Sequence, residues 1–346
     1  MGETIAPDVL VVGAGIAGAG VAAELAGALG VVLVEQENRP GYHSTGRSAA
    51  LFFQNYGNAA IRALSRASRP LFEAADPKLF PNPLFSPRGA LEVADAASHP
   101  ILEALLAESE GMRAITSDEA CAMVPVLKRE RVYAAAYEAD AQDIDVAALH
   151  QGFLRKARAG GARLLTEAAL VGARPRSGGG WRVETKAATV EAKIIVNAAG
   201  AWADRVAEAC GVAPIGIQPM RRSIAVLPPP AGHDVSRWPL FGDVSETWYA
   251  KPDAGRLLVS PADQDPVEPH DVSVDDMVLA EGLHRFEQAV DYPVTHVERR
   301  WAGLRSFAPD PRLPASTARR KTSSGWRGRA GMASRPRRPC RSSRHA

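Results

Sequence analysis

The stretch VLVVGAGIAGAG, from Val9 to Gly20, decides the fold of this chain. It begins within an apolar run, Asp8–Val12, that is typical of a buried strand, and glycines follow at positions 13, 15 and 18 before a helix of small residues. Glycine inside a helix or strand costs roughly 0.5–1 kcal/mol relative to alanine, so a cluster of glycines indicates close approach of another group to the main chain. The pattern predicts a strand, a tight turn and a helix beside a ligand.

The next apolar run, GVVLVEQ, predicts a second strand that ends at Glu35. In the spacing G-x-G-x-x-G the first glycine permits the turn, the second lets backbone N–H groups reach a pyrophosphate, and the third lets helix and strand pack closely. The carboxylate of Glu35 is suited to accept hydrogen bonds from the ribose hydroxyls of an adenosine. A glycine-rich turn without a ligand is the less favoured alternative, and the motif alone leaves FAD and NAD open. The predicted residues are Gly13, Gly15, Ile16, Ala17, Gly18 and Glu35.

Composition limits the class of protein. The 346 residues, 46% of them hydrophobic, suffice for two domains with sizeable cores. The net charge of +2 is uneven, because residues 311–346 hold 11 Lys and Arg and no acidic residue. The chain before them is acidic, so a nucleic-acid partner has no support.

The three cysteines lack metal-ligand spacing and suit a reducing compartment, so we expect no metal and a cytoplasmic location. The run Val9–Val34 contains several glycines and Glu24, which argue against a transmembrane segment.

The polar loop after Glu35 contains PGYHSTGRSAA, Pro40–Ala50. This string resembles the flavin loop of the D-amino-acid and glycine oxidase family, and most closely that of D-arginine dehydrogenases. The resemblance implies FAD as the cofactor. It also implies that the loop holds the pyrophosphate and flanks the flavin through Ser44, Thr45, Arg47, Ser48 and Ala49.

Further segments resemble the same family in the same order. The segment Asp143–Leu165 resembles the strand and helix that return to the flavin domain, with Asp145 as the N-cap. KIIVNAAGAWAD resembles a second cofactor contact, at Ala198, Ala199 and Gly200. The implied fold is α/β: a discontinuous Rossmann-type FAD domain and an antiparallel-sheet substrate domain. We place the first at 1–80 and 140–215, the second at 81–139 and 216–304, and the start of the return to the first at 305–310.

Oxidation of an amino acid by a flavin requires an anchored carboxylate, and arginine binds a carboxylate bidentately. By the resemblance, Arg305 in WAGLRSF binds the carboxylate and Arg222 in MRRS is a second pocket arginine. Tyr249 matches a pocket tyrosine and Tyr56 a tyrosine of the lid loop. The alternatives are ordinary ion-pair arginines and core tyrosines.

Two positions depart from the arginine dehydrogenases. Ala90 stands where they have a glutamate that meets the substrate guanidinium, and Leu51 stands where they have an active-site histidine. Alanine leaves a buried cation unpaired, which costs several kcal/mol, so a neutral D-amino acid is the expected substrate. Leu51 removes a candidate polar contact to the amine, which weakens the amino-acid assignment at this point. We place Leu51, Ala90 and Gly303 in the substrate pocket.

The C-terminal segment lacks the family's glycine-rich stretch near the flavin. Read in the next frame, the codons from Thr322 to Arg335 can encode F-F-W-L-A-G-Q-G-G-Y-G-I-Q, which resembles that stretch. Met332 followed by Ala333 forces a glycine in that reading. We interpret residues 311–346 as an out-of-frame, disordered basic tail; the alternatives are a genuine basic interaction tail and a disordered tail unrelated to a frameshift.

The expected reaction is hydride transfer from Cα–H of a D-amino acid to FAD, which gives an imino acid and then a 2-oxo acid. The expected partner is a small amino-acid substrate, and the electron acceptor stays open. An NAD-dependent Rossmann dehydrogenase and a non-catalytic truncated product are the alternatives.

Overall fold

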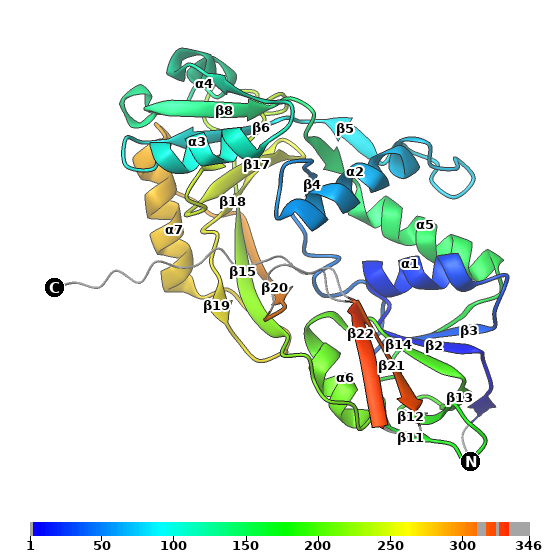
Figure 1. The fold of residues 1–346 in the computed structure, drawn as a ribbon. Helices are drawn as coiled ribbons and strands as arrows, with labels where there is room; N and C mark the ends of the chain where they lie inside the picture. Colours follow the sequence, from blue (N-terminus) through cyan, green and yellow to red (C-terminus); the bar gives the residue numbers. More distant parts are fainter. Residues whose placement is uncertain (1–2, 310–315, 323–324, 332–346) are drawn as a thin grey trace.

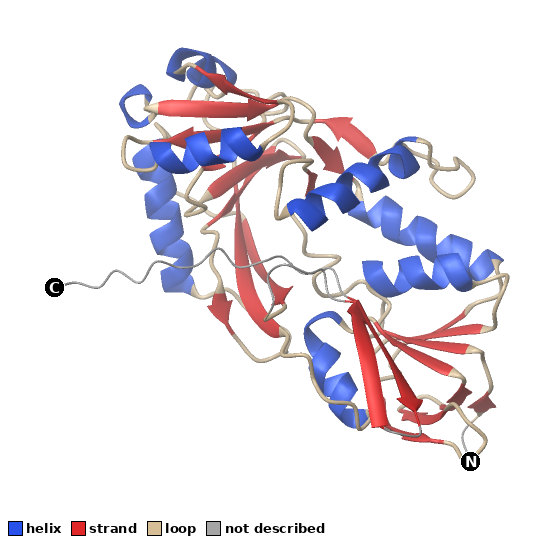
Figure 2. Ribbon diagram, viewed as in Figure 1, coloured by secondary structure: helices blue, strands red, loops and turns tan. Residues whose placement is uncertain are grey.

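The computed structural model describes residues 3–309, 316–322 and 325–331. The described chain forms two lobes, with one sheet system near the N-terminus and a larger sheet at the opposite end (Figure 1). Both lobes contain helices and strands (Figure 2). The predicted fold class, a Rossmann-type α/β domain joined to an antiparallel-sheet domain, is confirmed.

A parallel sheet forms the centre of the first lobe, with the strand order β10-β3-β2-β14. These strands are β10 (Arg163–Leu165), β3 (Val31–Val34), β2 (Val9–Val12) and β14 (Ile194–Asn197). Every residue of β2 and β3 is buried, as expected of strands covered on both faces. The helices α1 (Ile16–Leu25) and α5 (Val146–Ala159) pack against each other, and they cover one face through Val9, Val11 and Leu33.

The other face of this sheet packs against a second, smaller sheet. Leu10, Val12 and Val32 meet Val183 and Val190 there. The smaller sheet consists of β1 (Thr4–Ile5), β13 (Thr189–Ala192), β12 (Trp181–Thr185) and β11 (Leu170–Pro175). Next to β14 along the chain lie η2 (Gly200–Trp202) and α6 (Ala203–Ala209). The carboxyl ends of β2, β3 and β14 thus meet at one edge of the parallel sheet, where ligands bind in such folds.

The second lobe is a nine-stranded sheet in the order β19-β15-β18-β17-β16-β6-β8-β7, with β20 paired to β15. Its main core lies on one face around Phe241, Trp248 and Phe286. The strands are β6 (Ala90–Ala94), β7 (Met112–Ile115), β8 (Ala134–Glu138), β15 (Gln218–Leu227), β16 (Leu240–Asp243), β17 (Tyr249–Asp253), β18 (Arg256–Ser260), β19 (Asp265–Pro266) and β20 (Arg299–Phe307). The helices of this lobe are α3 (His99–Glu108), α4 (Ser117–Met123), η1 (Arg129–Arg131) and α7 (Asp276–Ala289).

Short elements connect the lobes. The strands β4 (Leu51–Phe52) and β5 (Phe85–Pro87) both pair with β9 (Gln142–Ile144), and α2 (Ala59–Glu73) lies between β4 and β5 in the chain. Asp145 is the predicted N-cap of α5: its Oδ1 accepts a hydrogen bond of 2.8 Å from Ala148 N.

Two details bear on the expected domain limits. Residues 305–307, which we expect to start the return to the FAD domain, continue β20 and pair with β15. Within residues 311–346, for which the sequence predicts disorder, the backbone of β21 (Ser316–Thr322) and β22 (Gly325–Gly331) forms an antiparallel hairpin. Residues 310–315, 323–324 and 332–346 lie outside the described residues.

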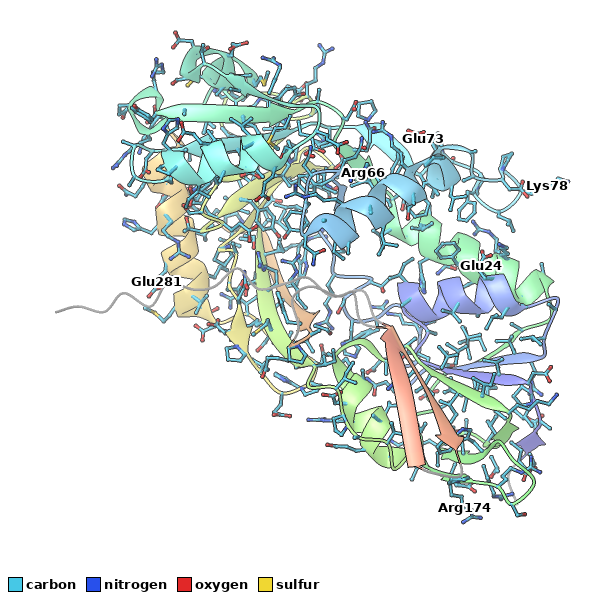
Figure 3. All side chains as sticks on the ribbon, in the orientation of Figure 1. Glu24, Arg66, Glu73, Lys78, Arg174 and Glu281 are labelled. Atoms are coloured by element: carbon cyan, nitrogen blue, oxygen red, sulfur yellow. The ribbon has the colours of Figure 1, made fainter. Side chains whose placement is uncertain are left out.

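Charged side chains mark the periphery. Arg174 of β11 and Glu281 of α7 are exposed and lie at the outer margins of the molecule (Figure 3), and Glu24 of α1 is exposed as well. Among the described residues, no helix has the length and apolar character needed to cross a bilayer, and no group of three or more His, Cys, Asp or Glu is arranged to hold a metal ion.

Candidate cofactor and substrate site

The turn after β2 requires glycine at two of its three motif positions. Gly13 has φ +98°, and a Cβ there would lie 2.5 Å from the carbonyl oxygen of Ala198. A Cβ at Gly18 would lie 1.8 Å from the carbonyl oxygen of Gly13, so the helix could not seat against the turn. At Gly15 a Cβ would meet only Thr45 Oγ1, at 3.2 Å. The protein's own packing therefore restricts position 15 far less than positions 13 and 18.

Side chains from outside the turn hold its backbone groups. Glu35, at the end of β3, is buried, and its Oε2 accepts from Ala14 N at 2.9 Å. Thr45 Oγ1 accepts from Ile16 N, at the start of α1, at 3.0 Å. Ala17, the next residue of α1, is exposed. The helix start presents partial positive charge at the turn, which favours an anionic ligand.

A cavity of about 270 Å³ opens at this edge of the parallel sheet. It brings together most of the predicted dinucleotide residues from four separate segments of the chain. These are Gly13, Gly15, Glu35, Ser44, Thr45, Ala198, Ala199 and Gly200. A cavity lined by a glycine turn, a helix start and a carboxylate fits the adenosine and pyrophosphate part of a dinucleotide.

The sequence analysis missed aromatic residues of this cavity. Tyr42, His43 and Trp202 line it, and the rings of His43 and Trp202 lie 4.4 Å apart. His43 Nε2 also lies 2.8 Å from Glu37 Oε1. Both ring residues stand inside the quoted motifs, but only the fold brings the two motifs together, so their spacing in sequence gave no signal.

The predicted flavin loop continues away from the cavity toward β20. Ser44 Oγ donates to the carbonyl oxygen of Leu304 at 2.6 Å, and Trp301 Nε1 donates to that of Arg47 at 3.2 Å. The Arg47 guanidinium donates to the carbonyl oxygen of Ala302 at 3.1 Å and pairs with Asp271. The structure thus uses the Arg47 guanidinium to join the two lobes, while Ser48 is exposed.

The predicted carboxylate-binding arginines share one face of the large sheet. Arg222 pairs with Gly303, and Met220 pairs with Arg305, in the β15–β20 register. Paired residues and residues two apart point to the same face, so Arg222, Gly303 and Arg305 lie together. A Cβ at Gly303 would lie 3.4 Å from Arg47 Cβ, which places the flavin loop directly over this face.

Apolar contacts confirm that the cofactor loop and this face meet. Ile224, Val226 and Leu258 form a buried cluster that packs against Ala49, Tyr249 and Trp301. Ala49 is a predicted flavin-loop residue and Tyr249 a predicted pocket residue. The face that carries Arg222 therefore lies beneath the predicted flavin loop.

Arg222 is a buried cation. It is 8% exposed, and its Nε and Nη2 have no hydrogen-bond partner within the described part of the chain. Burial and the neighbouring positive charge of Arg305 lower the pKa of Arg222. Because a buried cation without a counter-charge is costly, the site suits an anion placed between the two arginines.

The remaining predicted pocket residues lie farther along the same sheet or over it. Leu51 of β4 pairs with Asp143, which forms an ion pair of 2.8 Å with Lys251 of β17. The Tyr56 ring lies 5.4 Å from that of Phe53 in the loop before α2. Ala90 is fully buried in β6.

A buried carboxylate lies directly opposite Ala90. Glu138 of β8 pairs with Ala90, so both side chains point to the same face. Glu138 is 2% exposed; its Oε1 accepts from Gln54 N at 3.0 Å. Its Oε2 is buried without a hydrogen-bond partner among the described residues. The sequence analysis missed Glu138 because the pairing of β6 with β8 bridges a long separation in the chain.

Comparison with known proteins agrees with this geometry. The sequence profile described as "FAD dependent oxidoreductase" (DAO) matches residues 8–323. The chain belongs to the DAO family of FAD-dependent oxidoreductases. Membership decides between the two nucleotides left open by the turn, because the DAO family uses FAD.

Two solved structures illustrate the similarity of fold. Glycine oxidase from Geobacillus kaustophilus superposes with a TM-score of 0.81 at 22% identity, over 96% of this chain and 90% of that one. L-proline dehydrogenase from P. horikoshii superposes with a TM-score of 0.76 at 20% identity, over 91% of this chain and 85% of that one.

Among curated proteins, mitochondrial dimethylglycine dehydrogenase from Mus musculus is 29% identical over 140 residues, 40% of this chain. That match spans 16% of the relative's length, a small part of it.

Proposed function

We propose that this DAO-family chain oxidises the CH–NH2 group of a D-amino acid, with FAD as the hydride acceptor. The observation that carries the proposal is Arg222, a buried guanidinium beside Arg305 on the face beneath the flavin loop, whose Nε and Nη2 have no partner among the described residues. A substrate carboxylate would supply a negative charge in direct contact with the guanidinium and make bidentate hydrogen bonds. Anchoring the carboxylate fixes the position of Cα relative to the cofactor loop.

The residues of the cavity fit FAD. The glycine turn, Glu35 and Thr45 would hold the adenosine and pyrophosphate, and the segment Arg47–Ala49 would lie near the ring. When bound, FAD supplies the acceptor for the two electrons of the oxidation. Arg222 and Arg305 would orient the substrate, and Tyr249, which lies on the same face, would donate to its carboxylate.

A carboxylate-deficient substrate analogue tests the proposal. D-leucine and its amide, D-leucinamide, differ only in the group that would meet Arg222. We expect D-leucine to perturb the flavin absorbance at a concentration about a hundredfold lower than D-leucinamide does. Equal affinity for the two ligands would show that the arginine pair does not bind the carboxylate.

The side chain of the substrate follows from Ala90 and Leu51, which favour a neutral group such as that of D-leucine or D-methionine. Glu138 favours a second substrate class, basic D-amino acids such as D-arginine. Its buried Oε2, which has no partner in the described part of the chain, lies opposite Ala90 and can accept from a donor at the end of a long side chain. Faster reduction of the flavin by D-leucine than by D-arginine supports the neutral class, and the reverse order supports the second class.

The chain as it stands is also proposed to be a poor enzyme. Flavin reduction builds negative charge on the ring, and the family stretch missing after Asp310 carries backbone donors toward it. Loss of one such donor in other enzymes costs roughly 2.7–4 kcal/mol. A frame-restored chain, assayed beside the 346-residue chain at equal flavin content, tests this; equal turnover would refute the frameshift as a functional claim.

A further inference from the structure

His150 of α5 lies behind the dinucleotide turn, and no role in the site has been assigned to it. It is 3% exposed, and its Nε2 lies 2.8 Å from the carbonyl oxygen of Ala14. A carbonyl oxygen can only accept, so Nε2 carries the proton and donates. The imidazole is therefore held in one tautomer by the backbone of the turn.

This hydrogen bond fixes the orientation of the peptide between Ala14 and Gly15. The chain contains no cis peptide among its described residues, and in a trans peptide the C=O and N–H point in opposite directions. Because His150 draws the carbonyl toward α5, the Gly15 N–H points away from α5. Gly15 lines the cofactor cavity, and no hydrogen bond within the described part of the chain uses its N–H.

His150 also contacts the second cofactor segment. Gly41 has φ +76°, and a Cβ there would lie 2.9 Å from His150 Cε1. Thr45, farther along that segment, accepts from Ile16 N at 3.0 Å. The imidazole thus lies where the glycine turn and the Gly41–Thr45 loop meet, and it can set both relative to the cavity.

We propose that His150 is a positioning residue for FAD: by donating to the Ala14 carbonyl it directs the Gly15 N–H toward the pyrophosphate. The effect concerns the phosphates alone, since the donor that His150 orients belongs to the backbone of the turn. It is independent of which substrate the enzyme oxidises.

Two nearly isosteric substitutions in the full chain test the proposal. Glutamine at position 150 keeps an N–H donor, whereas methionine of similar length has none. With ADP as the probe, we expect His150→Met to weaken binding about ten- to hundredfold and His150→Gln to weaken it less than about threefold. Adenosine, which lacks phosphates, is expected to bind all three proteins alike. His284→Met, at an exposed position of α7, is the matched control.

Equal ADP affinity of His150→Met and His150→Gln would overturn the proposal, and so would equal losses for ADP and adenosine, which indicate general loosening of the fold. If His150→Met does not fold, the wild-type imidazole decides the question. Its ¹⁵N spectrum at neutral pH is expected to show the proton on Nε2, and a proton on Nδ1 instead would contradict the proposal.

Discussion

The two halves of the site are built in different ways. The dinucleotide half depends on a continuous stretch in which Gly13 and Gly18 avoid contacts of 2.5 and 1.8 Å. The substrate half depends on strands far apart in the chain, since Arg222 meets Gly303 only through the β15–β20 pairing. The first half is specified by local backbone geometry and the second by sheet register. Substitutions should therefore affect folding and cofactor binding in the first half, and catalysis in the second.

The largest expected effect separates folding from binding within the glycine turn. Gly18→Val places a side chain against the Gly13 carbonyl, so we expect a loss of about 4 kcal/mol or more in the free energy of unfolding. Gly15→Val meets only the Thr45 hydroxyl, so the protein should fold but bind FAD at least about a hundredfold more weakly. Urea unfolding and flavin fluorescence titration measure the two effects. A yellow, FAD-saturated Gly15→Val protein would contradict the assigned role of this glycine.

In the substrate half, Arg222→Met should reduce kcat/KM by about 10³, since a buried charge partner of the carboxylate is worth 2–5 kcal/mol. The free energy of unfolding should stay the same or rise by about 1 kcal/mol, because the variant removes a buried cation whose Nε and Nη2 have no partner among the residues that the structure describes. FAD affinity should not change. Arg222→Lys serves as the control and should keep part of the activity, because it retains the charge but loses the bidentate fork. Destabilisation as large as that of Gly18→Val would show that Arg222 is mainly structural.

The third prediction concerns the distal end of the substrate half. Glu138→Gln preserves the hydrogen bond from Gln54 N while removing the negative charge. If the second substrate class is correct, the ratio of kcat/KM for D-arginine to that for D-leucine should fall about tenfold or more in the variant. An unchanged ratio would show that Glu138 only supports the structure of the loop, and neutral D-amino acids would remain the proposed substrates. In that case Ala90→Glu should raise the activity toward basic D-amino acids.

The smallest effect is expected where the two halves join. The Arg47 guanidinium, with Tyr42 adding a hydrogen bond, lowers the pKa of Asp271 below its usual 3.8. A lowered folded-state pKa means that the ion pair stabilises the protein above pH 3.8 and that this contribution is lost as the pH falls through the folded-state value. Asp271 is mostly exposed, so the contribution is only a few tenths of a kcal/mol. Asp271→Asn should lower the melting temperature slightly at pH 7 and match that of the wild type near pH 2. A difference in melting temperature that grows as the pH falls would contradict the assigned role of this ion pair.

The contrast between the halves also explains what the sequence could predict. The positions of Gly13, Gly18 and Glu35 follow from local sterics and strand ends: in the structure Gly13 and Glu35 line the cavity, and Gly18 packs against the carbonyl oxygen of Gly13. His43 and Trp202 come from segments that meet only in the fold, and Glu138 becomes relevant only through its register with Ala90. His150 lies on a helix whose residue pattern is that of an ordinary amphipathic helix, so the pattern does not single out this histidine. Long-range pairing, which a single sequence does not encode locally, determines these contacts.

Anaerobic bleaching of the flavin by D-amino acids tests the link between the two halves most directly. The measurement compares the frame-restored chain with its Arg222→Met variant, both loaded with FAD, and uses dithionite as a reductant that needs no substrate site. We expect D-amino acids to bleach the restored chain, the variant to bleach about 10³-fold more slowly, and dithionite to bleach both equally. Equal rates of bleaching by D-amino acids in the two proteins, or no bleaching of the restored chain by any D-amino acid, would contradict a site in which Arg222 anchors an amino acid beneath the flavin.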